Sequence, residues 1–159
     1  TEEALQKSQG HYQEGVATLS GDRQKAFVSF QKAVQLNPKN KEARYGLGHV
    51  YALQGKLAQA EEEFRSAIQI DDAYSEAHTY LGQVLASQGK WEEAMESFED
   101  AVLANPASVP PALTHLELGR VYSKLGYAAK AREVLGKVKA LDKSGEYTDA
   151  ATELLARLK

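Results

Sequence analysis

Residues 41–74 read KEARYGLGHVYALQGKLAQAEEEFRSAIQIDDAY, and residues 75–108 read SEAHTYLGQVLASQGKWEEAMESFEDAVLANPAS. Both stretches, and residues 112–145 after them, follow one 34-residue register. Places 8 and 15 are glycine, place 20 is alanine, place 24 is large and apolar, and place 27 is Ala or Val: Gly48, Gly82 and Gly119; Gly55, Gly89 and Gly126; Ala60, Ala94 and Ala131; Phe64, Phe98 and Leu135; Ala67, Ala101 and Val138. Agreement at so many places in successive copies indicates a repeat architecture.

Each copy divides into two predicted helices around its second glycine. In residues 75–108, small or large packing residues recur at spacings of three and four on both sides of Gly89: His78, Leu81, Gly82 and Leu85, then Ala94, Phe98 and Ala101. This spacing places each set on one helix face, and glycine permits the positive φ of a tight turn. Pro106 is expected to end the second helix. One helix pair cannot bury its apolar face alone, so the pattern predicts stacked pairs with a concave inner wall.

Both ends of the chain carry weaker versions of the pattern. Residues 7–40 keep the matching places of the second half, but Gly15 stands six residues before Gly21 where the other copies have seven. We interpret this stretch as a degenerate first repeat, since terminal repeats are commonly atypical. Residues 146–159 predict a last helix with one apolar stripe, which is expected to cap the end of the stack. A docking helix for a partner is the alternative for this segment.

The repeat resembles a known family through its opening residues and its small places. The residues that carry the resemblance are Leu47, Gly48, Tyr51, Gly55, Ala60, Phe64 and Ala67, and again Leu118, Gly119 and Tyr122. They are similar to the tetratricopeptide repeat, over residues 7–145. The resemblance implies an all-α fold, a right-handed superhelical solenoid of four helix-turn-helix pairs: 7–40, 41–74, 75–108 and 112–145. With the capping helix 146–159, it is expected to form a single domain over residues 1–159.

The sequence offers no candidate for catalysis. It has no Cys, which excludes disulfides, thiolate metal sites and Cys nucleophiles. It contains no phosphate-binding loop with Lys-Ser/Thr, no His-Glu-x-x-His and no Gly-x-Ser-x-Gly. No apolar run is long enough to span a membrane. A net charge of −3, without aromatic residues interleaved among the basic ones, argues against nucleic acid as a partner. We therefore expect a non-enzymatic protein with no cofactor and no bound metal.

The expected function lies in the inner wall. In the tetratricopeptide repeat the first helix of each pair lines this wall, which implies a partner-binding groove made of Tyr45, His49, Leu53, Thr79, Tyr80, Gln83, Leu116, Arg120 and Lys124. Such a wall suits a peptide or helix segment of a protein partner, with an acidic group near Arg120 and Lys124. Two alternatives remain open. His49 can be a passive residue, and the two cations can instead neutralise the acidic repeat 75–108.

Two narrower resemblances within the family bear on the partner. Chaperone-binding family members grip a C-terminal carboxylate with Lys, Asn and Arg at set places, and of these only Arg120 fits. The link from Asn105 to Leu113 inserts residues 109–111 between two repeats. This link, and the opening His11-Tyr12-Gln13-x-Gly15, resemble bacterial type IV pilus biogenesis lipoproteins, the pilotins of the outer-membrane secretin.

The pilotin resemblance implies a periplasmic scaffold, anchored by lipid outside this sequence, that helps secretin subunits assemble. The alternative is an adaptor or regulatory module of a cytoplasmic complex or of a larger multidomain protein. A signal peptide ending in a lipobox Cys before Thr1 would favour the pilotin.

Overall fold

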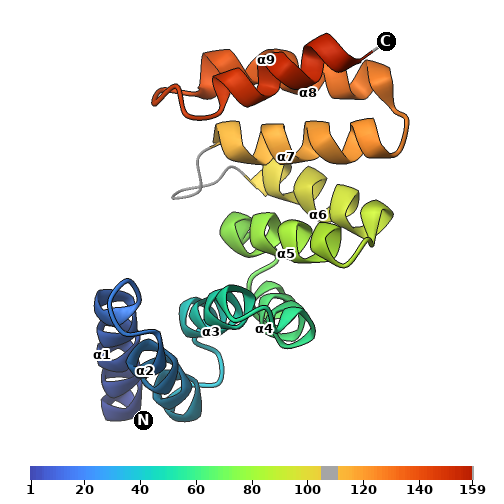
Figure 1. Cartoon of the computed structure of the whole chain (residues 1–159). Helices are drawn as coiled ribbons and strands as arrows, with labels where there is room; N and C mark the ends of the chain where they lie inside the picture. Colours follow the sequence, from blue (N-terminus) through green and yellow to red (C-terminus); the bar gives the residue numbers. More distant parts are fainter. Residues whose placement is uncertain (105–110, 159) are drawn as a thin grey trace. The chain divides into compact units, whose positions relative to one another are not determined.

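The computed structural model describes residues 1–104 and 111–158, and within these residues it contains nine α-helices and no β-strand (Figure 1). The helices are α1 (Glu2–Thr18), α2 (Arg23–Leu36), α3 (Lys41–Leu53), α4 (Leu57–Ile70), α5 (Ser75–Ser87), α6 (Trp91–Ala104), α7 (Pro111–Lys124), α8 (Ala128–Leu141) and α9 (Thr148–Arg157). Consecutive helices pack as the pairs α1–α2, α3–α4, α5–α6 and α7–α8. The predicted all-α fold of four helix pairs plus a last helix is confirmed.

The chain forms two compact units, Thr1–Asp72 and Ala73–Lys159. Unit 1 contains the first two helix pairs and unit 2 contains the other two pairs with α9. The expected single domain over residues 1–159 stays a prediction. Of the inserted residues 109–111, only Pro111 lies within the described part, where it begins α7. Val109, Pro110 and the predicted helix end at Pro106 lie outside it.

The core of unit 1 is built on close approach of helices at glycines. Phe30 of α2 is buried, and a Cβ at Gly15 of α1 would lie 2.5 Å from its ring. A Cβ at Gly46 of α3 would lie 2.7 Å from the same ring. The Phe30 ring therefore packs directly against the backbones of α1 and α3. It can do so because Gly15 and Gly46 have no side chain that would occupy the same space. Ala26, Leu47 and Val50 complete this cluster.

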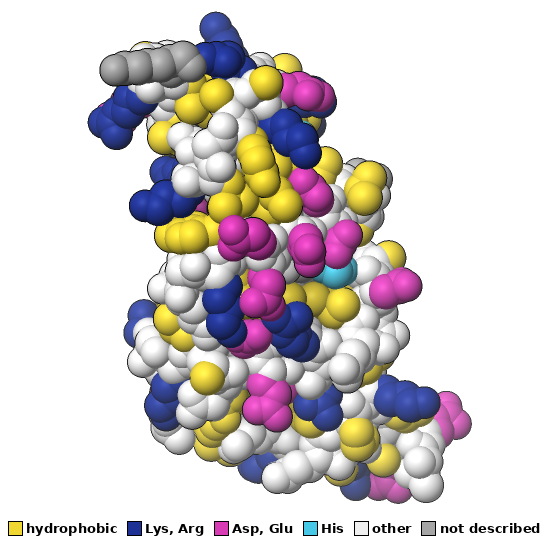
Figure 2. Space-filling model, turned by 90° about the vertical axis from the view of Figure 1, so that its right-hand side faces the viewer, with side chains coloured by type: hydrophobic (Ala, Val, Ile, Leu, Met, Phe, Trp, Pro, Cys, Tyr) yellow, Lys and Arg dark blue, Asp and Glu magenta, His cyan; other side chains and the backbone are white. Residues whose placement is uncertain are grey.

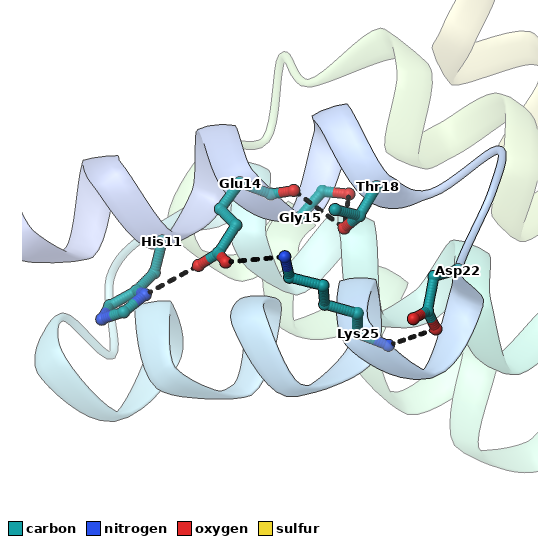
Figure 3. A network of polar contacts seen from close by, with 6 residues as sticks. All are labelled: His11, Glu14, Gly15, Thr18, Asp22 and Lys25. Carbon is teal, nitrogen blue, oxygen red and sulfur yellow. Dashed lines mark hydrogen bonds and ion pairs between the residues drawn. The ribbon is translucent and has the colours of Figure 1, made fainter.

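A polar network joins the first two helices of unit 1 (Figure 3). Glu14 of α1 lies 3.5 Å from the ring of His11 and 3.6 Å from Nζ of Lys25 on α2. The carboxylate of Asp22 accepts a hydrogen bond from the backbone N–H of Lys25, which caps the start of α2. The hydrogen bond from His11 is the main cause that lowers the pKa of Glu14, and Lys25 adds to it.

Unit 2 repeats the glycine contacts. Phe98 of α6 is fully buried, and a Cβ at Gly82 of α5 would lie 2.7 Å from its ring. In the next pair a Cβ at Gly119 of α7 would lie 2.4 Å from the side chain of Leu135 on α8. The turns between paired helices contain Gly55, Gly89 and Gly126 with φ of 72°, 76° and 81°. The predicted turn at Gly21 is present, but its φ is not positive.

The N-terminus of α9 is capped by a residue that lies outside the helix. Asp142, in the turn after α8, accepts hydrogen bonds from the backbone N–H groups of Gly145, Tyr147 and Thr148 at 2.8–2.9 Å. It also accepts from the hydroxyls of Ser144 and Thr148. Tyr147, at the N-cap position, makes no side-chain cap of its own. Asp142 therefore takes over the N-cap function for α9, which begins two residues later than predicted.

Candidate partner-binding faces

In unit 1 the three predicted groove residues lie along α3 and differ in exposure. Leu53 is 43% exposed, whereas Tyr45 and His49 are half-buried. The Tyr45 ring lies 6.3 Å from the ring of His49 and 5.8 Å from that of Phe64, between centroids. Burial lowers the pKa of His49, and the charge of Arg23 lowers it further. This face of α3 therefore offers an apolar end at Leu53 and an aromatic middle.

In unit 2 two of the predicted groove residues are not available to a partner. Thr79 is 0% exposed, and its hydroxyl lies 3.1 Å from that of Thr114 on α7. Leu116 is 3% exposed. Both residues occupy place 5 of their repeats, and α7 and α9 respectively pack over the helices that carry them. The prediction that Leu116 is exposed is wrong, because this place faces the next helix layer and not solvent.

Of the predicted groove residues on α5 and α7, the accessible ones stand at places 6, 9 and 13. Tyr80 and Gln83 of α5 are half-buried, and Arg120 and Lys124 of α7 are exposed. Burial raises the pKa of Tyr147, and Tyr80 is near enough to contribute to that shift.

The two cations of α7 have partners within unit 2. Arg120 Nη1 lies 3.1 Å from Oε1 of Glu117, one turn earlier on the same helix. Nζ of Lys124 lies 5.3 Å from the centroid of the Trp91 ring on α6. Neither forms an ion pair with a carboxylate of residues 75–104 within the described part of the chain. The alternative in which they neutralise the acidic repeat thus has no direct contact to support it.

Glu117, at place 6 of its repeat, belongs to this face as well. Its side chain is only 17% exposed, and burial raises its pKa, while Arg120 opposes that shift. Sequence reasoning missed Leu5 and Val16 of α1, which are 53% and 51% exposed. Their separation of eleven residues places them on one helix face, so the signal was present in the periodicity.

The described residues contain no group of three or more His, Asp or Glu side chains that could hold a metal ion. None of their helices combines the length and the apolar character needed to cross a bilayer.

Solved structures with the same arrangement include two pilus proteins. Pseudomonas aeruginosa PilF matches with a TM-score of 0.83 and 23% identity, over 97% of this chain and 70% of that one. PilW, described as a widely conserved type IV pilus biogenesis factor, matches with a TM-score of 0.80 and 27% identity, over 96% and 68%. The Thermus thermophilus protein TTC0263 matches at 0.75 and 27%, over 94% and 81%. A search of curated proteins gives no significant match.

Family models decide the classification. Models described as tetratricopeptide repeat match residues 17–65, 52–114 and 112–144, which together include most of the chain. The contacts of Gly46, Gly82 and Gly119 lie within these matches, whereas Gly15 precedes the first of them. The pilus proteins among the structural neighbours agree with the narrower resemblance in the sequence. The chain belongs to the tetratricopeptide repeat family, whose members are generally non-catalytic scaffolds for protein interactions.

Proposed function

We propose that this scaffold binds a peptide or helix segment of a partner protein on the first-helix faces of its pairs. The observation that carries the proposal is the α7 face of unit 2, where exposed Arg120 and Lys124 lie one helical turn apart. Two exposed cations at this spacing can serve one acidic group together. Because Glu117 holds Arg120 from one side, an acidic partner group competes with Glu117 for the same guanidinium.

The apolar anchors of the proposed contact are fewer than the sequence indicated. Thr79 and Leu116 are buried between helices, which leaves Tyr80 and Gln83 on α5 as neighbours of the α7 cations in unit 2. In unit 1, Leu53 and Tyr45 supply an apolar and aromatic face on α3. Aromatic residues next to polar ones are the usual anchors of polypeptide interfaces.

We further propose that the partner belongs to the machinery of type IV pilus biogenesis, and that this partner is the secretin. The similarity to PilF and PilW supports this proposal, together with the His11-Tyr12-Gln13-x-Gly15 opening. Such a role would place the protein in the periplasm with a lipid anchor outside this sequence. A tetratricopeptide module of Spaghetti (RPAP3) bound to an HSP90 peptide also has this fold, at 21% identity. We do not extend that ligand to this chain, because only Arg120 fits the carboxylate-binding pattern.

The test is calorimetric binding of a purified type IV pilus secretin subunit to the chain and to a variant that carries Arg120→Glu and Lys124→Glu. We expect the wild-type complex to form, to weaken at raised salt because exposed charge pairs are screened, and to be lost in the variant. The control variant carries Lys139→Glu and Arg157→Glu, the same charge change on exposed residues of α8 and α9. This control should bind as the wild type does.

Two outcomes would contradict the proposal at different levels. If the secretin binds the Arg120 and Lys124 variant as strongly as the wild type, the α7 face is not the binding site. If no secretin binds at all, the pilus assignment fails, and the alternative of an adaptor module in a cytoplasmic complex or larger protein is favoured. Circular dichroism of each variant must first show an unchanged helical spectrum.

A further inference from the structure

The second helices of the two pairs in unit 2 carry opposite charge. Helix α6 contains five carboxylates and no basic residue: Glu92, Glu93, Glu96, Glu99 and Asp100. Helix α8 contains four basic residues and one acidic residue: Lys130, Arg132, Lys137, Lys139 and Glu133. All of these except Glu99 are exposed. Figure 2 shows Lys and Arg side chains gathered over the end of the unit with α8 and α9, and Asp and Glu side chains below them at the height of α6.

One side chain connects the acidic and basic helices. The hydroxyl of Tyr122 on α7 donates a hydrogen bond to Glu99 of α6 at 2.5 Å. The ring of the same tyrosine has Nζ of Lys130, on α8, 5.5 Å from its centroid. Helices α6 and α8 therefore flank Tyr122 within one compact unit. Their outer surfaces together form what we call the bipolar face, made of the residues named above.

An apolar side chain interrupts this charged face. Leu103 of α6 is 83% exposed, more than any other large apolar side chain in the described residues. It occupies place 29 of its repeat, where the first two repeats have Gln35 and Gln69 and the last has Ala140. Ala140 lines a cavity of about 450 Å³ together with Leu141 and Tyr147. A single exposed Leu is common on protein surfaces, so Leu103 is informative only together with the opposite charges of α6 and α8.

We propose that the chain forms a homodimer in which α6 of one copy packs on α8 of a second copy. A two-fold axis that runs along these helices and between them sets equal places against each other. Place 19 then brings Glu93 to Lys130, and place 26 brings Asp100 to Lys137. Place 29 brings Leu103 to Ala140 and the cavity beside it. Each contact occurs twice, because a two-fold interface is self-complementary.

The same arrangement also contains one like-charge pair. Place 22 brings Glu96 to Glu133, the one acidic residue on α8. Glu133 lies 3.5 Å from Lys137 of its own helix, which reduces this repulsion. Exposed ion pairs each contribute little, so the dimer depends on Leu103 for affinity and on the charges for orientation. The closed symmetry predicts dimers and not filaments.

The test is sedimentation equilibrium of the full chain over a concentration series at low and high salt. We expect a monomer–dimer equilibrium whose dissociation constant rises with salt. Leu103→Gln, which installs the residue of the first two repeats, should raise that constant about tenfold or more. The matched control is Val16→Gln, which removes a similarly exposed apolar side chain from α1 of unit 1 and should leave the dimer unchanged.

Charge exchange tests the orientation. Asp100→Lys alone and Lys137→Asp alone should each weaken the dimer, because each places like charges opposite one another twice. The chain that carries both changes should dimerise as the wild type does, and so should an equimolar mixture of the two single variants. A chain that stays monomeric at every soluble concentration would overturn the proposal. A dimer that survives Leu103→Gln and both charge reversals would overturn it equally, since that dimer would use another surface.

Discussion

The hydroxyl oxygens of Thr79 and Thr114 lie 3.1 Å apart, and both side chains are fully buried between α5 and α7. The bond joins the first helices of two successive pairs in unit 2. Thr79 was expected to contact a partner, but its hydroxyl instead links α5 to α7. Its role is structural, and its partner is another residue of the same chain.

We predict that removing both hydroxyls costs less than the sum of the costs of removing each one alone. Thr79→Val or Thr114→Val leaves the other hydroxyl buried without its partner, which costs about 1–3 kcal/mol. The double variant loses both polar groups and should be less destabilised than the sum of the single variants. Urea unfolding followed by circular dichroism measures all three free energies. Strictly additive effects would show that the two hydroxyls do not depend on each other.

The glycine contacts predict opposite effects of the same substitution at two positions. Gly82→Ala places a Cβ 2.7 Å from the buried Phe98 ring and should destabilise the fold by about 1–3 kcal/mol. Gly136→Ala, on exposed α8 with nothing within 4 Å, should instead stabilise it by about 0.5–1 kcal/mol through helix propensity. Thermal melts of both variants check the sign. Equal shifts would mean that the Gly82 contact is not tight.

Truncation of Phe98 measures how much its burial contributes to the free energy of unfolding. It is fully buried against Gly82, so Phe98→Ala should cost about 3–5 kcal/mol. The free energy of unfolding in urea measures this cost. A loss below about 1 kcal/mol would contradict the placement of Phe98 in the core, since truncation of a buried aromatic side chain always exceeds it.

The 34-residue register predicted the packing of the two helices within each repeat. It did not predict which residues the helices of the next repeat would bury. Gly82 and Phe98 were paired in advance, because close helix approach demands a small residue opposite a large one. The burial of Thr79 and Leu116 was not visible, because place 5 shares a helix face with exposed places and is covered only by the next helix. The capping role of Asp142 was not predicted, since nothing in its spacing shows that its carboxylate reaches the amides that begin α9.

That carboxylate leads to a prediction about the last helix. Partial burial opposes the ionisation of Asp142, but the hydrogen bonds from Thr148, Ser144 and two backbone amides dominate and hold its pKa well below the usual range. Asp142→Ala should lower the melting temperature and reduce helix content, because α9 loses its N-terminal cap. Asp149→Ala, an exposed carboxylate on α9 itself, is the control and should change both much less. Equal effects of the two variants would contradict the capping role.

The pKa of His49 predicts how stability depends on pH. Burial is the main cause that lowers this pKa in the folded chain, and Arg23 adds to it. The folded state therefore resists protonation, while the unfolded state binds a proton near the ordinary histidine pKa of 6.5. The unfolded state then binds more protons, and stability rises with pH in this window. The contribution is fully present above pH 6.5 and is lost as the pH falls through that value toward the folded-state pKa.

We therefore expect the melting temperature of the wild type to fall between about pH 7.5 and 5.5, and His49→Gln to remove that part of the slope. The raised pKa values of Glu63 and Glu117, which burial causes, act in the opposite direction near the acidic end of the range. Both carboxyl groups are present in the wild type and in His49→Gln, so the difference between the two slopes reports the contribution of His49 alone. A wild-type melting temperature that stays constant across this window, or a His49→Gln variant that keeps the wild-type slope, would show that His49 is protonated equally in both states.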